Sequence, residues 1–257
     1  MDRVQLLGVM VHKVTLQQAV ERIEEWISGP RTACRFVVTP NLDHAVLLTE
    51  RSDLRDAYAS ASLVIADGMP MVWASRLTGA ALEQRVAGSD LVPALLERRG
   101  SKQALRVYLL GAAPGVADRA AENIHRRFRN VDVVGTHAPE LGFERHESQN
   151  QAIVQMINDA SPDVLIVGLG APKQELWIHK YAPQIGGGVA ICAGATIDFL
   201  AEHRQRAPVW MQRTGTEWLY RALSEPRRLI PRYAKDAWRL PGLLYGDWKA
   251  ARSTVAF

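Results

Sequence analysis

The stretch Ser62-Leu-Val-Ile-Ala-Asp67-Gly-Met-Pro70 decides the fold of this chain. Leu63–Ala66 is a run of four apolar residues, which is typical of a short strand buried on both faces. Gly68 and Pro70 end this strand and allow a helix to begin at about Met71. Asp67 therefore stands at the carboxyl end of a buried strand, which is where ligands bind in open α/β sheets.

Two interpretations of Asp67 are open on this stretch alone. A carboxylate held at a strand end can accept a proton or bind a ribose hydroxyl. Alternatively, Asp67 caps the helix that follows it, as aspartate often does. The choice between them depends on what the other strands carry at their ends.

Apolar runs with the period of strands and of helices alternate along the first 200 residues. Strands are expected over residues 4–11, 34–38, 63–66, 105–110, 131–134, 164–167 and 189–192. Helices are expected over residues 15–27, 42–48, 54–61, 90–99, 116–128, 148–159 and 172–181 and from about residue 71. This alternation predicts an α/β, Rossmann-like fold, with a mostly parallel sheet and helices on both of its faces.

The strand pattern stops near residue 200. Beyond it we expect short helical pieces interrupted by prolines, at Pro208, Pro226, Pro231 and Pro241. The chain is therefore predicted to have two parts. Residues 1–200 form the α/β catalytic domain, and residues 201–257 form a C-terminal helical appendage.

The appendage differs from the rest of the chain in charge. Residues 202–257 carry eleven Lys and Arg against five Asp and Glu, a net charge of +6, so the remainder of the +4 chain has −2. The same segment holds four of the seven tryptophans, Trp210, Trp218, Trp238 and Trp248. A basic, aromatic segment suits an anionic partner, either nucleic acid or a membrane surface. For Trp210 and Trp218 the alternative interpretation is that their side chains pack against the core.

Some classes of protein and site are not expected. No run approaches the roughly 18 apolar residues of a membrane span, and no signal-peptide pattern opens the chain, which predicts a cytoplasmic protein. Cys34 and Cys192 lie in apolar runs and are predicted to be buried thiols. The seven histidines lack the spacing of metal ligands, and no Asp-x-Asp pair is present, so no metal site is predicted.

Glycine-rich turns follow two of the predicted strands. Gly168-Leu-Gly170-Ala-Pro-Lys173-Gln174 leads into a helix, and glycines there let the backbone approach a phosphate at the helix N-terminus. Lys173 and Gln174 would project from the first helical turn. The turn that begins at Gly111 is a weaker version of the same device, without a basic residue.

Polar side chains follow two further strands. Thr39 and Asn41 offer a hydroxyl and an amide after the strand over 34–38, although Asn41 is equally suited to cap the next helix. Asp198 follows the last predicted strand, where an acid commonly binds a ribose hydroxyl. A surface cap is the alternative for Asp198.

Several of these motifs occur together and in a fixed order. They are Val38-Thr-Pro-Asn41, Ala66-Asp-Gly-Met-Pro70, Gly168-Leu-Gly-Ala-Pro-Lys-Gln-Glu175, Arg206-Ala-Pro208, Glu217-Trp-Leu-Tyr-Arg221 and Glu225-Pro-Arg-Arg228. In this combination the chain resembles the WecG/TagA/CpsF family of bacterial glycosyltransferases, from Val4 to about Tyr233. One departure is Glu202, where the family commonly has glycine.

The resemblance implies an inverting, metal-independent enzyme without a cofactor. It would move N-acetylmannosamine or its uronic acid from a UDP donor to an undecaprenyl-diphosphate-linked acceptor sugar, in the assembly of a cell-surface polysaccharide. Such an enzyme works as a peripheral protein at the cytoplasmic face of the cell membrane. Because some relatives use UDP-glucose or UDP-galactose, the resemblance leaves the donor sugar open.

The resemblance also assigns roles to particular residues. Asp67 falls where the family places its proposed catalytic base. The other matching positions are pocket residues (Thr39, Asn41 and Gln174), an acid near the uridine (Asp198) and active-site arginines of the appendage (Arg221, Arg227 and Arg228).

Two other functions compete with this interpretation. A nucleic-acid-binding module would suit the basic appendage, but Asp67 and Asp198 would repel a polyanion, so no nucleic acid is expected as a partner. A nucleotide hydrolase or sugar-nucleotide epimerase is nearer, but an epimerase needs a nicotinamide-binding fingerprint or a Tyr-x-x-x-Lys motif, and neither is present. The sequence leaves the oligomeric state open, and a homo-oligomer would bury exposed surface of the appendage.

Overall fold

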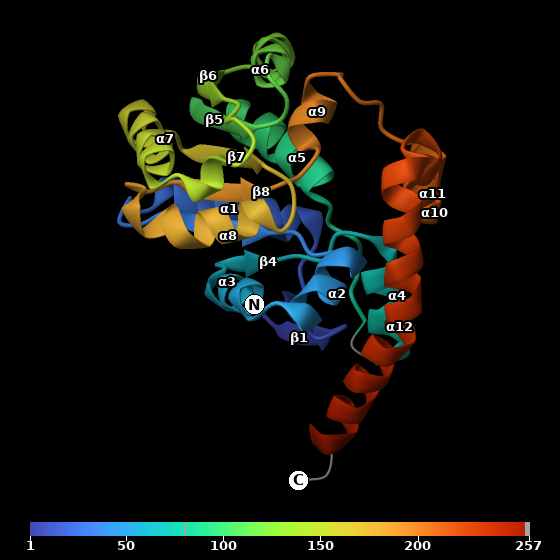
Figure 1. Cartoon of the computed structure of the whole chain (residues 1–257). Helices are drawn as coiled ribbons and strands as arrows, with labels where there is room; N and C mark the ends of the chain where they lie inside the picture. The colour runs from blue at the N-terminus through green and yellow to red at the C-terminus, as the bar shows by residue number, and fades with distance from the viewer. Residues whose placement is uncertain (80, 255–257) are drawn as a thin grey trace.

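A parallel sheet forms the centre of the computed structural model, which describes residues 1–79 and 81–254, without the side chains of residues 213 and 251–254 (Figure 1). The sheet has six strands in the order β4-β3-β8-β7-β5-β6. The strands are β3 (Arg35–Val38), β4 (Leu63–Val64), β5 (Leu105–Gly111), β6 (Val131–His137), β7 (Val164–Gly168) and β8 (Val189–Cys192). Every neighbouring pair is parallel, so all carboxyl ends lie at one edge of the sheet.

Helices cover both faces of this sheet. One face packs against α1 (Leu16–Ser28), α5 (Gly88–Gly100), α6 (Val116–Arg127) and α9 (Thr196–Leu200). The other packs against α2 (Leu42–Glu50), α3 (Ser52–Ser60), α7 (Glu147–Ala160) and α8 (Lys173–Tyr181). The predicted α/β fold class is therefore confirmed.

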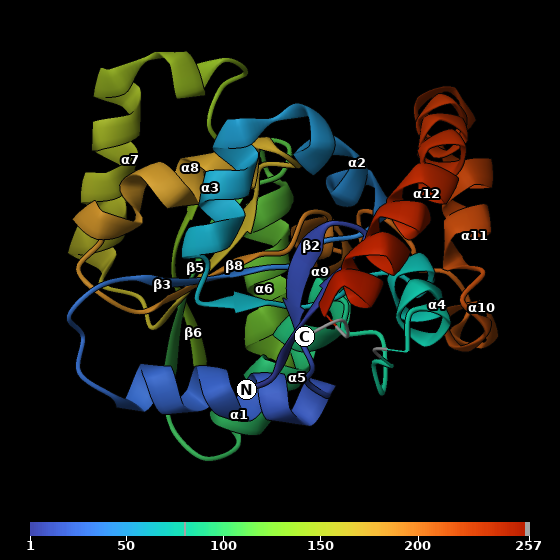
Figure 2. The same ribbon diagram turned by 90° about the horizontal axis from the view of Figure 1, so that it is seen from below.

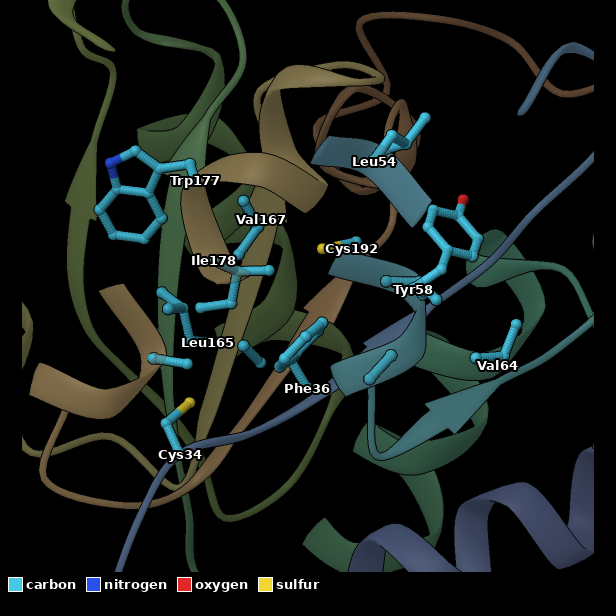
Figure 3. Close-up of a cluster of buried hydrophobic side chains, with 14 of the residues drawn as sticks. Cys34, Phe36, Leu54, Tyr58, Val64, Leu165, Val167, Trp177, Ile178 and Cys192 are labelled. Carbon is cyan, nitrogen blue, oxygen red and sulfur yellow. The ribbon is translucent and has the colours of Figure 1, made fainter. Parts of the chain in front are cut away.

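Alternation along each strand produces these two cores. Val37 faces one helical layer, whereas its neighbours Phe36 and Val38 face the other. Figure 3 shows the second layer, where Phe36, Val167 and Cys192 lie among side chains of α3 and α8. Cys34 and Cys192 are free and buried there, as predicted. The strands read as continuous apolar runs because both of their faces are covered.

The prediction of one opening strand over Val4–Val11 is wrong. The segment forms an antiparallel hairpin, β1 (Arg3–Leu6) and β2 (Val9–His12), which is a sheet of its own. Leu7 and Gly8 form the turn, and both have positive φ, 52° and 77°. Such angles are those of the tight turns that suit the twist of a hairpin.

The C-terminal segment is also more regular than predicted. After α10 (Val209–Thr214) and α11 (Glu217–Ser224), a single helix, α12, spans Pro226–Thr254 over 29 residues and contains Pro231 and Pro241. Each proline removes one backbone hydrogen bond. Packing compensates, because Leu229 is fully buried and Leu240 and Leu244 pack against the core.

Helix α12 packs against α2 and α11, and α4 (Met69–Leu77) lies near it (Figures 1 and 2). Near its end Asp247 is buried, and its carboxylate accepts hydrogen bonds from the backbone N–H groups of Leu7 and Gly8. The helix is thus attached to the hairpin at the opposite end of the chain. The last residues of the predicted appendage, 255–257, lie outside the described residues.

Several aromatic side chains of the C-terminal helices are exposed. Trp238 is 85% exposed, and Trp210 and Trp218 are 63% and 46% exposed, so the alternative that the latter two pack into the core is wrong. Trp248 and Tyr245 stack on each other near the end of α12. Among the described residues, no helix is long and apolar enough to cross a membrane.

Candidate active site

A cavity of about 650 Å³ lies at the carboxyl edge of the sheet, between the strand ends and the C-terminal helices. It brings together eleven of the predicted site residues, namely Thr39, Asn41, Asp67, Gly111, Gly168, Gly170, Lys173, Gln174, Asp198, Arg221 and Arg228. Arg227 is exposed and does not line this cavity, because it points to another side of α12. Parallel strand ends converge in this way, so residues far apart in sequence share one site.

Asp67 is held in this cavity by its backbone. Its N–H donates to the carbonyl of Pro40 at 2.8 Å, and the preceding carbonyl of Ala66 accepts from Val86 N–H at 3.0 Å. Gly68, and not Asp67, is the N-cap residue of α4, and no side chain caps that helix, so the capping alternative is wrong. The carboxylate accepts no hydrogen bond from the residues that the structure describes.

The surroundings of Asp67 change its acidity. Burial raises the pKa of this carboxyl to about 6, and the guanidinium of Arg85 partly opposes the shift. A carboxylate with such a pKa is a stronger base than an ordinary aspartate and is still ionised at neutral pH.

Arg85 is the main charged neighbour of Asp67, and the sequence did not single it out. Its guanidinium donates to Glu217 of α11 at 2.8 Å and to Asp90 of α5 at 2.8 Å. Arg206 completes the network through a 2.8 Å ion pair with Asp90. The network joins the strand ends to the C-terminal helices beside the cavity.

Replacing Arg85 with methionine is expected to destabilise the fold by about 3 kcal/mol, because the partly buried Glu217 then loses its charged partner and Asp90 keeps only Arg206. The measurement is urea unfolding at pH 7. The control is Arg22→Met, which breaks an exposed pair with Glu25 and should change stability by less than about 1 kcal/mol. Equal stability of the two variants would contradict this view of the network.

Thr39 and Asn41 both use one polar atom within the protein. The hydroxyl of Thr39 donates to the carbonyl of Cys192 at 3.0 Å, so towards a ligand this oxygen can only accept a hydrogen bond. The Asn41 side chain accepts from His44 N–H and caps α2, as the local alternative predicted, and the residue also lines the cavity.

The glycine turns pack backbone against backbone. Gly111 and Gly168 are neighbours in the sheet, and a Cβ atom on Gly111 would lie 2.5 Å from the backbone of Gly168. A Cβ atom on Gly168 would lie 3.0 Å from the carbonyl of Gly194. Only glycine permits the ends of β5, β7 and β8 to meet so closely. The backbone of Gly111, Gly168 and Gly194 forms a surface of the cavity, here called the glycine floor, at which a ligand can touch the main chain.

Gln174 and Glu175 form a buried polar group beneath this floor. Gln174 accepts from Gly194 N–H at 3.2 Å and donates to the Glu175 carboxylate at 2.8 Å. Glu175 is fully buried, and His44 lies 3.9 Å from its carboxylate. Gln174 therefore holds the end of β8 in place as well as lining the cavity.

The remaining predicted side chains at the strand ends have acidic or basic partners. Lys173 pairs with Glu144 at 3.2 Å and lies over the ring of Phe143. Asp198 lies 3.8 Å from Arg204, which also pairs with Glu225.

The C-terminal helices form the opposite wall. Arg221 of α11 lines the cavity, as does Arg228, whose guanidinium donates to Glu225 at 2.7 Å. The structure adds lining residues that the sequence analysis did not select, including Trp73, Trp218, Arg232, Tyr233 and Asp236. Their signal in the sequence is weak, because each reaches the cavity only through the packing of α4, α11 or α12 at the sheet edge.

The site therefore combines the Asp67 carboxylate, which accepts no hydrogen bond from the described residues, with a glycine-lined floor and several arginines. This arrangement can bind a phosphorylated ligand and remove a proton from a hydroxyl beside it. Within the described ranges no group of three or more His, Cys, Asp or Glu could hold a metal ion.

Comparison with known proteins identifies the family of this chain. The family model of the glycosyl transferase WecG/TagA/CpsF family matches residues 4–254. An N-acetylglucosaminyldiphosphoundecaprenol N-acetyl-beta-D-mannosaminyltransferase of Bacillus spizizenii is 30% identical over 203 residues, 77% of this chain and 76% of that protein. A protein of the same name from Staphylococcus aureus (strain MW2) is 29% identical over 227 residues, 88% of this chain and 87% of its own length. The match across almost the whole chain shows that it belongs to the WecG/TagA/CpsF family of glycosyl transferases.

Proposed function

We propose that this enzyme transfers N-acetylmannosamine, or its uronic acid, from UDP to N-acetylglucosamine carried on undecaprenyl diphosphate. The acceptor and the sugar are taken from the names of the two relatives. The observation that carries the proposal is the position of Asp67, whose carboxylate faces the same cavity as the glycine floor and the arginines of α11 and α12.

Asp67 acts as the base in this proposal. It removes the proton from the attacking hydroxyl of the acceptor sugar as that oxygen bonds to the anomeric carbon of the donor. The bond from that carbon to the UDP oxygen breaks on the opposite side, which inverts the configuration. The proton is then on Asp67, and the electron pair leaves with UDP.

The leaving diphosphate gains negative charge in this step. Backbone N–H groups around Gly168–Ala171 and the guanidinium groups of Arg221 and Arg228 are the proposed stabilising donors. Loss of one such donor typically costs about 3 kcal/mol of transition-state stabilisation. Since these groups supply positive charge themselves, the reaction is proposed to need no divalent cation.

The appendage is proposed to hold the enzyme on the inner face of the membrane, where the acceptor lipid is anchored. The exposed rings of Trp238 and Tyr245 support this role, since tryptophan and tyrosine favour the headgroup zone. Each Lys or Arg near an anionic leaflet contributes about 1 kcal/mol.

The function is tested by a screen of UDP-sugars against a short-chain polyprenyl-diphosphoryl-N-acetylglucosamine, with release of UDP as the measurement. We expect turnover with UDP-N-acetylmannosamine or its uronic acid, at the same rate with and without EDTA. Turnover with UDP-glucose or UDP-galactose alone would contradict the proposed donor sugar. Loss of activity in EDTA would contradict the metal-independent mechanism.

A further inference from the structure

Helix α12 carries two buried aspartates in different situations. Asp247 is 5% exposed, and its carboxylate is occupied by the N–H groups of Leu7 and Gly8. Asp236 is 3% exposed and lines the cavity, and its Oδ1 has no hydrogen-bond partner among the described residues. A buried carboxylate without a partner is costly for the fold, so Asp236 needs another explanation.

The neighbours of Asp236 make this end of the cavity acidic and polar. Asp43, in the first turn of α2, also lines the cavity, and Arg232 lies 3.5 Å from its carboxylate. Arg232 is one turn before Asp236 on α12, yet its Nε has no hydrogen-bond partner. Burial and the charge of Asp43 raise the pKa of Asp236 to about 6, against the opposing effects of Arg232 and Lys235.

The sheet order places this cluster on one side of the site. Asp43 follows β3, and Asp67 follows β4, the neighbouring edge strand. The glycine floor instead follows β5, β7 and β8 on the other side. Of the two substrates, the one bound over β3 and β4 lies next to the proposed base and away from the proposed diphosphate site.

The chemistry of the cluster selects part of a substrate. Asp43, Asp236 and Arg232 together carry a net charge of −1 when both carboxylates are ionised, which disfavours a diphosphate, and an isoprenoid chain offers the carboxylates no hydrogen-bond donor. A neutral sugar ring does offer donors, in its hydroxyl groups and in an acetamido N–H, and the aromatic rings of Trp73 and Tyr233 line the same cavity. Carboxylates beside aromatic rings therefore fit a neutral amino sugar best.

We propose that Asp236, assisted by Asp43, binds the acceptor sugar by accepting hydrogen bonds from its hydroxyl or acetamido N–H groups. This assignment rests on the proposed function, since it requires a sugar acceptor at this site. Asp236 is then a residue that determines acceptor specificity, and the acceptor sugar supplies the hydrogen bonds that the protein does not.

The test compares Asp236→Ala and Asp236→Asn with Asp247→Asn, a change of the same residue type on the same helix. Hydrogen bonds to a charged group are strong enough that Asp236→Ala should raise the KM for the lipid-linked acceptor about tenfold to a hundredfold. The KM for the donor and the rate of donor hydrolysis by water should stay within about twofold of wild type. Asp236→Asn should fall between wild type and Asp236→Ala.

Asp247→Asn is expected to lower Tm without changing either KM, because its carboxylate holds α12 and does not line the active-site cavity. An unchanged acceptor KM in Asp236→Ala, or an equal rise in both KM values, would overturn the assignment. If Asp236→Ala does not fold, Asp236→Asn decides by the same two KM values.

Failure of the proposed function looks different, since the wild-type protein would then transfer no sugar. In that case binding of the polyprenyl-diphosphoryl-N-acetylglucosamine analogue alone is measured by calorimetry. Binding that is lost in Asp236→Ala and kept in Asp247→Asn supports the site, and equal or absent binding in wild type and both variants overturns it.

Discussion

Replacing Asp67 with asparagine is expected to lower kcat by about 10²–10⁴-fold, the usual contribution of a general base. Asparagine keeps the shape of the side chain but cannot take a proton from the acceptor hydroxyl. The measurement is UDP release with both substrates present. The control is Glu140→Gln, an exposed acid that lines the same cavity at the end nearest β6 and should leave kcat unchanged. Near wild-type turnover in Asp67→Asn would remove the basis of the mechanism.

Because the pKa of Asp67 is raised, its role can also be tested by the pH dependence of turnover and of Tm. Only the ionised carboxylate can act as base, so kcat/KM of the wild type should fall about tenfold per pH unit below about pH 6. A folded-state pKa above the unfolded one means that ionised Asp67 opposes folding. Asp67→Asn should therefore raise Tm above pH 6, and this gain should disappear below about pH 4. A higher Tm with lost turnover separates a catalytic role from a structural one.

Deletion of residues from 202 onward is expected to lower turnover by more than about a thousandfold, because one wall of the cavity is lost. Arg221 and Arg228 line it from that side, and single charged donors of this kind are worth about 10²–10³ each in kcat. Binding to anionic vesicles should be lost together with turnover. The measurements are UDP release and co-sedimentation, with circular dichroism to verify that the α/β part remains folded.

A second variant separates the two effects of that deletion. Trp238 and Tyr245 are exposed on α12 and do not line the cavity, so changing both to alanine leaves the cavity wall intact. This variant should bind vesicles less well yet turn over a water-soluble acceptor analogue at the wild-type rate. Equal sedimentation of full-length, truncated and double-variant protein would contradict membrane binding by the appendage.

The sheet and most of its site were predictable because a parallel strand that is buried on both faces appears in the sequence as a short, continuous run of apolar residues. Runs such as Val164–Val167 stand out, and polar residues directly after a run must lie at the carboxyl edge. Thr39, Asp67 and Gly168 meet for this reason, although long stretches of chain separate them. Their chemical roles remain predictions.

Contacts between distant segments explain what the sequence did not predict. Arg85 lies in a loop without periodicity, and its partner Glu217 is 132 positions away, so no local pattern indicates the pair. Prolines in α12 suggested breaks, yet burial of Leu229 and Leu240 outweighs two missing backbone hydrogen bonds. Asp236 can be recognised as a site residue only from the structure, because its place in the cavity depends on α12 lying across the sheet edge.

Attachment of α12 to the N-terminal hairpin has a mechanical consequence. A helix that is fixed near both of its ends cannot swing about one of them. The cavity wall that it forms therefore has its shape before any substrate binds. Selectivity in such a pocket comes from a preformed outline. A change at Leu7 or Gly8, remote from every reacting atom, would then lower the temperature at which this wall is lost, and below that temperature the choice of sugar would stay the same.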